Sequence, residues 1–271
     1  MRRSLLGLLP CIVFLAAWTV GSSMVASGAL PGPLPIAWAL LEELTTSKCW
    51  IALGATSLRT LMSFVIAALL GIGLGIIPGR PGPLRDGTEA VIDFLRSIPG
   101  PALLPIFMTL FGLYAGPKIA LAVFVCSLIN AVYAGTGIRM AGRSPRVLMA
   151  ESFGASRRTT FWKVIFPSAL ELIISGLRVT LSLALVLSVL AELVLMTGNG
   201  IGVLIRVAYE DRKVAEMYAT IILSGGLGML FNKAFVLAER SMTWYGRAGV
   251  LHGRLRSLEI NLGRPTATRR P

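Results

Sequence analysis

Apolar runs without charge are the feature that most constrains this chain. No Asp, Glu, Lys or Arg occurs from Ser4 to Leu41, and none occurs between Arg59 and Arg80. Such runs reach the length of about 20 residues that a helix needs to cross a bilayer. Only 14% of the residues are charged, whereas a soluble domain carries about 25%. We therefore expect lipid, rather than water, to surround much of the folded chain.

The apolar runs predict an all-α membrane protein with about six transmembrane helices. We place these spans at residues 5–23, 58–77, 91–113, 118–138, 167–196 and 214–237. Pro99, Pro101 and Pro105 predict that the third span is kinked or begins late, because proline removes a backbone donor and clashes with the preceding turn. A short interfacial helix is expected at residues 36–44. Loops are expected at residues 78–89 and 198–213.

The N-terminal segment allows a second interpretation. Arg2 and Arg3 precede an apolar stretch and then small residues, an order that is typical of a cleaved signal peptide. The charge-free stretch extends to Leu41, however, which is longer than a signal peptide needs. We predict a retained first span.

Both termini are expected in the cytoplasm, because cytoplasmic loops carry an excess of Lys and Arg. With this orientation, the outer segments hold only Lys48, Lys118, Arg206, Arg212 and Lys213. The other Lys and Arg fall in inner segments, apart from a few inside spans. We divide the chain into a first span with an outer linker (1–54), a core helical domain (55–240) and a basic cytoplasmic tail, partly disordered (241–271).

Several kinds of function are disfavoured. The net charge of +13 lies between apolar runs, whereas a nucleic-acid binder would gather it on soluble surfaces, so no nucleic-acid partner is expected. Cys11, Cys49 and Cys126 lack metal-ligand spacing, and the single histidine, His252, lies in the tail. We therefore expect no metal site, no catalytic residues and no enzymatic activity in this chain.

The polar segment at residues 139–166 is the most informative one. Gly154 would break a helix there, because a residue without Cβ can turn sharply. Ser156 could cap the helix that follows. Phe161 and Trp162 would be half-exposed aromatic residues on a basic cytoplasmic surface, which suits a protein–protein contact.

This segment resembles the loop signature of ABC importer permeases, which reads E-A-A, three residues, G, nine residues and then I-x-L-P. Ala150, Gly154, Val164 and Pro167 fall on that spacing. The match departs at its start, where Leu148 and Met149 replace the Glu and the first Ala, and Glu151 does not restore the pattern.

The flanking motifs resemble the nitrate, sulfonate and taurine type of permease. They are Arg96-Ser97-Ile98-Pro99, Gly176-Leu177-Arg178, Ala191-Glu192 and Gly200-Ile201-Gly202. The resemblance covers about residues 55–240, so it includes the whole core helical domain.

The resemblance implies a type I importer permease in the bacterial inner membrane, importing a small nitrate-, sulfonate- or taurine-like solute. Two copies would form the pore, an extracytoplasmic binding protein would deliver the solute, and ATPase subunits would dock on the loop. The coupling residues would be Ala150, Glu151, Gly154, Ala155, Ser156, Arg157, Arg158, Phe161 and Pro167. The chain has no G-x-x-x-x-G-K-[ST] phosphate loop, so Mg-ATP would bind the partner and this chain would carry no cofactor.

Three polar residues inside spans are candidates for the translocation path, since polar groups in hydrocarbon are costly and often functional. They are Asn130, Arg178 and Glu192. Each has a structural alternative: an interhelical hydrogen bond for Asn130, an ion pair for Arg178, and contact with water at the outer end for Glu192. Arg178 and Glu192 lie about 21 Å apart on a regular helix, so they cannot pair with each other.

Two other classes of membrane protein are alternatives to a permease. An ion-coupled secondary carrier would need ionisable residues that converge near the midplane, and this chain offers few. An intramembrane enzyme would need a carboxylate cluster, a metal site or a nucleophile with its base, and the sequence shows none of these.

Overall fold

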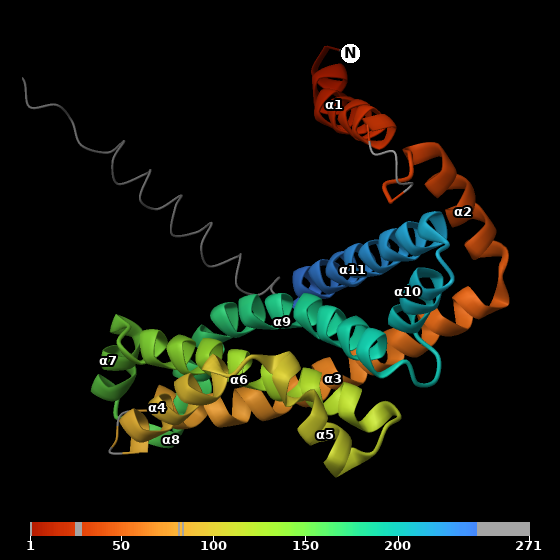
Figure 1. Ribbon diagram of the computed structural model, residues 1–271. Helices are drawn as coiled ribbons and strands as arrows, with labels where there is room; N and C mark the ends of the chain where they lie inside the picture. The colour runs from red at the N-terminus through yellow and green to blue at the C-terminus, as the bar shows by residue number, and fades with distance from the viewer. Residues whose placement is uncertain (1, 25–28, 81, 83, 243–271) are drawn as a thin grey trace, which may run out of the picture.

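The computed structural model describes residues 2–24, 29–80, 82 and 84–242. Regular secondary structure in this part of the chain is entirely helical (Figure 1). The basic tail predicted for residues 241–271 lies outside the described residues, apart from its first two positions. The division of the chain at residues 54 and 240 stays a prediction.

Three long helices form the centre of the fold, and they lie side by side in Figure 1. They are α3 (Ser47–Gly79), α6 (Ala115–Gly142) and α9 (Phe166–Leu195). Small residues let α3 approach α6 closely, as is common for helices in membranes. A Cβ atom added at Gly75 would lie only 2.7 Å from the Cβ of Ala134.

Two N-terminal helices precede this centre. Helix α1 (Arg2–Met24) stands apart from it, next to α2 (Pro33–Thr45). Helix α2 buries Ile36 and Ala39 against Ala219 of α11 (Val214–Met242). The short helix expected at residues 36–44 is therefore present and packs on the last long helix.

The described helices agree with the expected all-α membrane fold and allow its spans to be counted. Four are long and apolar enough to cross a membrane, or up to five if one bent pair counts as a span. The apolar part of α1 that can be assessed, Ile12–Met24, is shorter than these. About six spans were expected, so α1 and the bent pair account for the difference.

The bent pair replaces the third expected span. It consists of α4 (Leu84–Ser97), followed by η1 (Gly100–Leu103) and α5 (Leu104–Phe111), with an angle of 87° between them. Pro99, Pro101 and Pro105 lie at or beside this bend, so the predicted kink is confirmed. The loop expected at residues 78–89 was wrong, because α4 already begins at Leu84.

Two other sequence predictions also need correction. The expected loop at 198–213 contains α10 (Ile201–Glu210), an amphipathic helix that buries Ile201 and Ile205. The second span was expected to begin at residue 58, but α3 already begins at Ser47. Arg59 therefore lies well inside a helix.

The segment between α6 and α9 forms a helical elbow. It contains α7 (Pro145–Ser152), α8 (Arg157–Thr160) and one π-helical turn (Phe161–Ile165). The last two run directly into α9, so Arg157–Leu195 is one helical stretch of 39 residues. In Figure 1, α7 and α8 lie at one end of the long helices, and α5 and α10 lie at the other.

Candidate functional site

The elbow between α7 and α8 is built from local backbone geometry. Gly154 adopts a left-handed φ of 77°, where a residue without Cβ is favoured. The turn closes with a hydrogen bond of 3.1 Å from Ala155 N to Ala150 O. Ser156 Oγ accepts a hydrogen bond of 3.3 Å from Thr159 N at the start of α8. The predicted break at Gly154 and cap at Ser156 are both confirmed.

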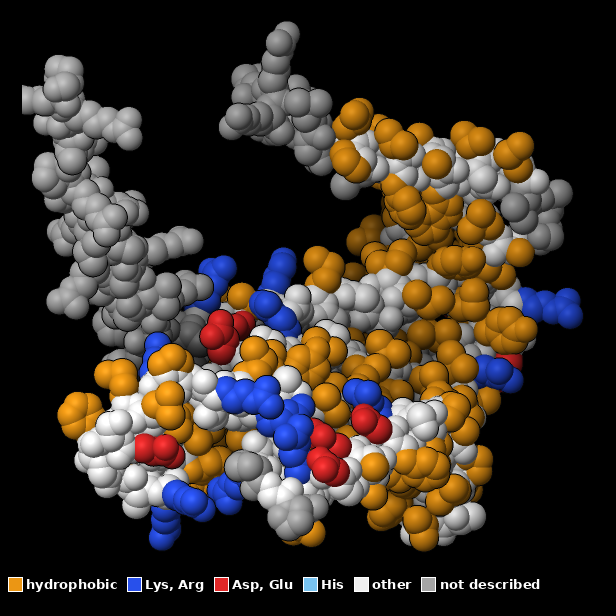
Figure 2. Space-filling model, turned by 90° about the vertical axis from the view of Figure 1, so that its left-hand side faces the viewer, with side chains coloured by type: hydrophobic (Ala, Val, Ile, Leu, Met, Phe, Trp, Pro, Cys, Tyr) orange, Lys and Arg blue, Asp and Glu red, His pale blue; other side chains and the backbone are white. Residues whose placement is uncertain are grey.

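An exposed apolar face lies on the outside of this elbow. The exposed fractions are 67% for Leu148, 60% for Met149 and 87% for Phe153. Figure 2 looks onto the end of the molecule that carries α7, where apolar side chains and basic side chains occur together. An apolar face beside Lys and Arg, in a short helix between two spans, is typical of a protein contact.

Phe161 and Trp162 differ in exposure, which corrects the prediction that both are half-exposed. Trp162 is 51% exposed, whereas Phe161 is buried. The Arg80 guanidinium lies over the Phe161 ring, 4.1 Å from its centroid. The burial of Phe161 could have been predicted from the sequence, because Phe161, Ile165 and Ala169 recur at helical spacing. The three residues pack in one hydrophobic cluster. Phe161 is therefore a packing residue in this structure.

Pro167 does not interrupt the helical stretch. It follows the π-helical turn Phe161–Ile165, where the usual i→i−4 hydrogen bonding is already interrupted, so its missing donor and its ring are accommodated. The stretch from α8 through the π-helical turn into α9 is therefore continuous around it.

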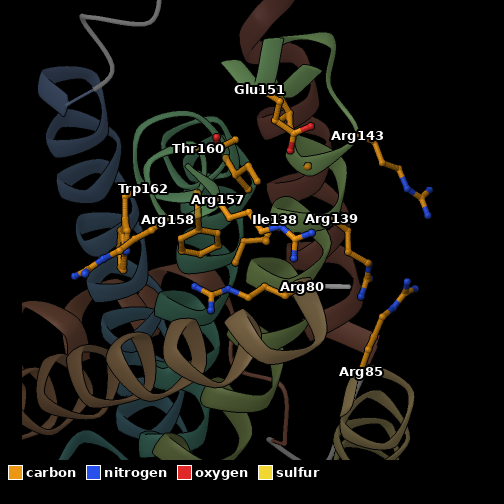
Figure 3. A pocket seen from close by; sticks show the side chains of 15 residues that line it. Arg80, Arg85, Ile138, Arg139, Arg143, Glu151, Arg157, Arg158, Thr160 and Trp162 are labelled. Atoms are coloured by element: carbon orange, nitrogen blue, oxygen red, sulfur yellow. The ribbon is translucent and has the colours of Figure 1, made fainter. Parts of the chain in front are cut away.

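Behind the elbow lies a basic cavity of about 740 Å³ (Figure 3). Four of the predicted coupling residues line it and come together there: Glu151, Arg157, Arg158 and Phe161. The sequence alone indicated no site for the four other arginines of the lining, which are Arg80, Arg85, Arg139 and Arg143. These four arginines all lie at the cytoplasmic ends of predicted spans. That shared position could have indicated that they meet in the folded chain.

Asn130 joins three helices in the middle of the fold. It is buried, and its Nδ2 donates a hydrogen bond of 3.3 Å to Ala67 O of α3. Its Oδ1 accepts one of 2.9 Å from Thr180 Oγ1 of α9. Both ends of the amide have partners, so the interhelical hydrogen bond that was the structural alternative is present.

Glu192 lies at the opposite end of the bundle from the elbow and is fully buried. The expectation that it could reach water at the outer end was wrong. Its carboxylate forms an ion pair with Arg59. Thr56 Oγ1 lies 2.8 Å from Oε2, and Gly202 N donates to Oε2 over 3.1 Å. Such multiple pairing is what permits a buried carboxylate.

The backbone of the loop after α9 and of the first turn of α10 passes directly over this carboxylate. A Cβ atom added at Gly202 would lie 2.7 Å from the Cβ of Glu192. One added at Gly200 would lie 2.7 Å from Glu192 Oε1. The glycines of the Gly200-Ile201-Gly202 motif therefore allow the loop to close over Glu192.

Arg178 is 44% exposed at its side chain and pairs with Glu239 of α11, with 3.7 Å between Nη2 and Oε2. The ion pair that was the structural alternative for Arg178 is therefore present. The rest of the Arg178 side chain stays accessible. Among the described residues, no group of three or more His, Cys, Asp or Glu could hold a metal ion.

Comparison with known proteins identifies the family. Residues 71–243 match the family model described as "Binding-protein-dependent transport system inner membrane component". This chain belongs to that family.

Named relatives agree with this family. The taurine transport system permease protein TauC of Escherichia coli (strain K12) is 30% identical over 84% of this chain and 85% of its own length. The putative aliphatic sulfonates transport permease protein SsuC of Bacillus subtilis (strain 168) is 30% identical over 87% of this chain and 86% of its own. The bicarbonate transport system permease protein CmpB of Synechococcus elongatus is 28% identical over 87% and 88%.

Solved structures share the fold. The chain superposes on an amino acid ABC transporter with a TM-score of 0.59 and 18% identity, covering 70% of this chain and 92% of the other. An inward-facing MetNI methionine ABC transporter gives 0.56 and 21%, covering 76% and 97%. The fold is therefore that of ABC importer permeases.

Family membership decides between the classes of function. The chain is a multi-pass inner-membrane transport permease, as the family model and its relatives are. These relatives are transport proteins rather than enzymes. The ion-coupled secondary carrier is not favoured.

Proposed function

We propose that this chain forms the translocation path of an ATP-driven importer and is coupled to a cytoplasmic ATPase through the elbow around Gly154. Mg-ATP would bind that separate subunit. A second copy of this chain would complete the path, and an extracytoplasmic binding protein would deliver the solute.

The observation that carries the coupling role is the continuous helix from the elbow across the bundle. Arg157–Leu195 is one helical stretch of 39 residues. It begins beside the exposed face of Leu148, Met149 and Phe153 and reaches Glu192 at the other end. A movement imposed at α8 is therefore carried along α9, because a hydrogen-bonded helix is stiff over this length.

The solute that fits best is a small anion. The relatives are named for the transport of taurine, aliphatic sulfonates and bicarbonate, each of which carries an anionic group. Among the candidates for the path, Arg178 offers an accessible positive charge. Asn130 and Glu192 have their polar atoms occupied by the protein, so we propose that they position the helices around the path.

Replacing Gly154 tests the coupling role. We expect Gly154→Leu to abolish solute uptake while the chain still inserts, because a side chain is strained at a φ of 77°. A Cβ atom at Gly154 meets no other atom within 4 Å, so crowding would not explain the loss. Gly87→Leu is the matched control, since Gly87 is also open and has no positive φ. Unchanged uptake in Gly154→Leu would show that the elbow has no coupling role.

Two further measurements test the partners and the solute. The tagged chain, purified from its native membrane in mild detergent, should bring an ATPase subunit with it. In vesicles that contain the complete complex, taurine, an alkanesulfonate, nitrate and bicarbonate should be compared as stimulators of ATP hydrolysis. Stimulation by none of them would overturn the proposed class of solute.

A further inference from the structure

The basic cavity behind the elbow holds more positive charge than the protein neutralises. Glu89 pairs with Arg139 and also lies 3.6 Å from Arg85 Nε. The four other arginines of the lining have no carboxylate partner within the described part of the chain: Arg80, Arg143, Arg157 and Arg158. Figure 3 shows Arg157 among the labelled residues of the lining, whereas Arg143 extends away from them. Unpaired guanidinium groups around a hollow favour a bound anion.

A buried hydroxyl group at the same cavity points to the same kind of ligand. Thr160 lines the cavity and is only 2% exposed. Its Oγ1 has no hydrogen-bond partner among the described residues. Buried polar groups are normally paired, so this hydroxyl is available to donate to an oxygen of a ligand.

The walls and the position of the cavity indicate where the anion comes from. Ile138, Val147 and Ile165 line it beside the arginines, so it accepts apolar atoms as well as charge. It lies where α3 and α6 end. With the orientation predicted from the Lys and Arg of the loops, this end faces the cytoplasm, at the level of the lipid head groups.

We propose that this cavity binds the phosphate group of an anionic phospholipid of the inner leaflet. Arg80 and Arg157 donate charge-assisted hydrogen bonds to the phosphate, and Thr160 Oγ1 donates a third. Arg80 is already held in place by its contact with the ring of Phe161. The glycerol and the first acyl carbons lie against the apolar wall.

This lipid site is separate from the face proposed for the ATPase. Within α7, Val147 and Glu151 line the cavity at helical spacing, whereas Leu148 and Met149 are exposed. A bound lipid therefore supports α7 from behind, and its binding does not depend on the coupling role.

The first test measures phospholipid retained by the complete permease–ATPase complex after purification in mild detergent. The complex is taken from vesicles of phosphatidylcholine with or without phosphatidylglycerol, and native mass spectrometry counts the lipid. We expect Arg80→Gln to lower retained phosphatidylglycerol about tenfold, because one charge-assisted hydrogen bond is lost. Arg146→Gln removes the same charge from an exposed residue of α7 outside the lining, so it should retain lipid as the wild type does.

A second variant covers the case in which Arg80→Gln does not fold. Thr160→Val keeps the volume and removes only the hydroxyl group. If that group binds phosphate, retained phosphatidylglycerol falls about threefold or more. If Thr160→Val raises the melting temperature and leaves lipid retention unchanged, the hydroxyl binds no lipid and the proposal is wrong.

Two other outcomes would also overturn the lipid assignment. Equal stabilisation by inorganic phosphate in lipid-free detergent would mean that the site takes free phosphate. Retention of lipid by the isolated permease, but not by its complex with the ATPase, would mean that the cavity belongs to the contact between these subunits.

Discussion

Glu192 of α9 pairs with Arg59 of α3, although 133 positions separate the two residues in the sequence. Arg59 also donates a hydrogen bond to Asn199 O, in the loop that follows α9. The fully buried Lys118 of α6 holds the same loop through Thr197 O. These contacts tie α3, α6 and α9 together at the end opposite the elbow, so a movement along α9 has a fixed point to act against.

The ion pair is expected to be essential for stability. Arg59→Met leaves a fully buried carboxylate without its charge partner, which costs about 3–5 kcal/mol. Glu192→Gln should cost less, because its amide oxygen can still accept from Thr56 and Gly202. Thermal unfolding of the purified complex measures both. Arg206→Met, which breaks the exposed pair with Glu210, is the control and should change the melting temperature little. A similar small change in Arg59→Met would contradict the prediction.

The close approach of the first turn of α10 to Glu192 predicts that position 202 accepts no side chain. Gly202→Ala should greatly reduce the yield of folded protein, since its Cβ would lie 2.7 Å from the Cβ of Glu192. Gly225→Ala is the matched control, because a Cβ atom at Gly225 in α11 meets nothing within 4 Å. The control should be neutral or slightly stabilising. Size-exclusion chromatography in detergent compares the two variants, and equal profiles would refute the argument.

Asn130 should stabilise the contact between the three central helices. We expect Asn130→Ala to cost about 0.6–1.7 kcal/mol, from the average to the maximum measured for hydrogen bonds between membrane helices, plus the loss of packing. The hydrogen bond with Thr180 predicts that Asn130→Ala and Thr180→Val are not additive. A double-mutant cycle of unfolding free energies measures this coupling. Strict additivity would show that the hydrogen bond contributes nothing.

The contact between α2 and α11 is expected to weaken as the pH rises. Burial raises the pKa of Glu43 above its usual 4.5, and the nearby Glu216 raises it further, although Lys213 opposes both. A raised pKa means that the folded state binds more protons, so stability falls as the pH increases from about 4.5 through the folded pKa.

Glu43→Gln tests this dependence by removing the titrating group. The variant should melt at a higher temperature than the wild type at pH 7, and the gain should vanish below about pH 4.5. Glu42→Gln, at the neighbouring exposed position, should give a smaller gain. A gain from Glu43→Gln that is the same at every pH would show that its charge is not responsible.

Features that depend on nearby residues could be predicted from the sequence, and those that depend on distant partners could not. The turn at Gly154 and the cap at Ser156 each depend on residues a few positions away, so both were found. The charge-free run after Arg59 led to a second span at residues 58–77, with Arg59 at its start. The partner of Arg59, Glu192, lies on another helix, and that pairing cannot be seen in a single sequence.

The cavity shows the same limit. Its arginines come from α4, α6, α8 and the positions directly after α3 and α6, so only the folded chain brings them together. The positive charge of these segments was predicted, but not its arrangement around a hollow. The prediction that Phe161 is half-exposed was wrong for a different reason. Its helical spacing with Ile165 and Ala169 did indicate burial.

The departure of this chain from the family's loop signature leads to the last prediction. Leu148 replaces the signature's Glu and is 67% exposed beside Met149 and Phe153. We therefore expect this chain's own ATPase to present an apolar surface there. Leu148→Glu should leave the melting temperature of the permease unchanged, because exposed substitutions shift stability by about 0.5 kcal/mol or less. It should lower the amount of ATPase that co-purifies, since the contact would then bury an unpaired charge. Leu84→Glu, which adds the same charge at an exposed leucine of α4 outside the elbow, is the control and should retain the ATPase. Undiminished or stronger recovery of the ATPase with Leu148→Glu would show that the partner still carries the basic or polar surface that the family's Glu would meet.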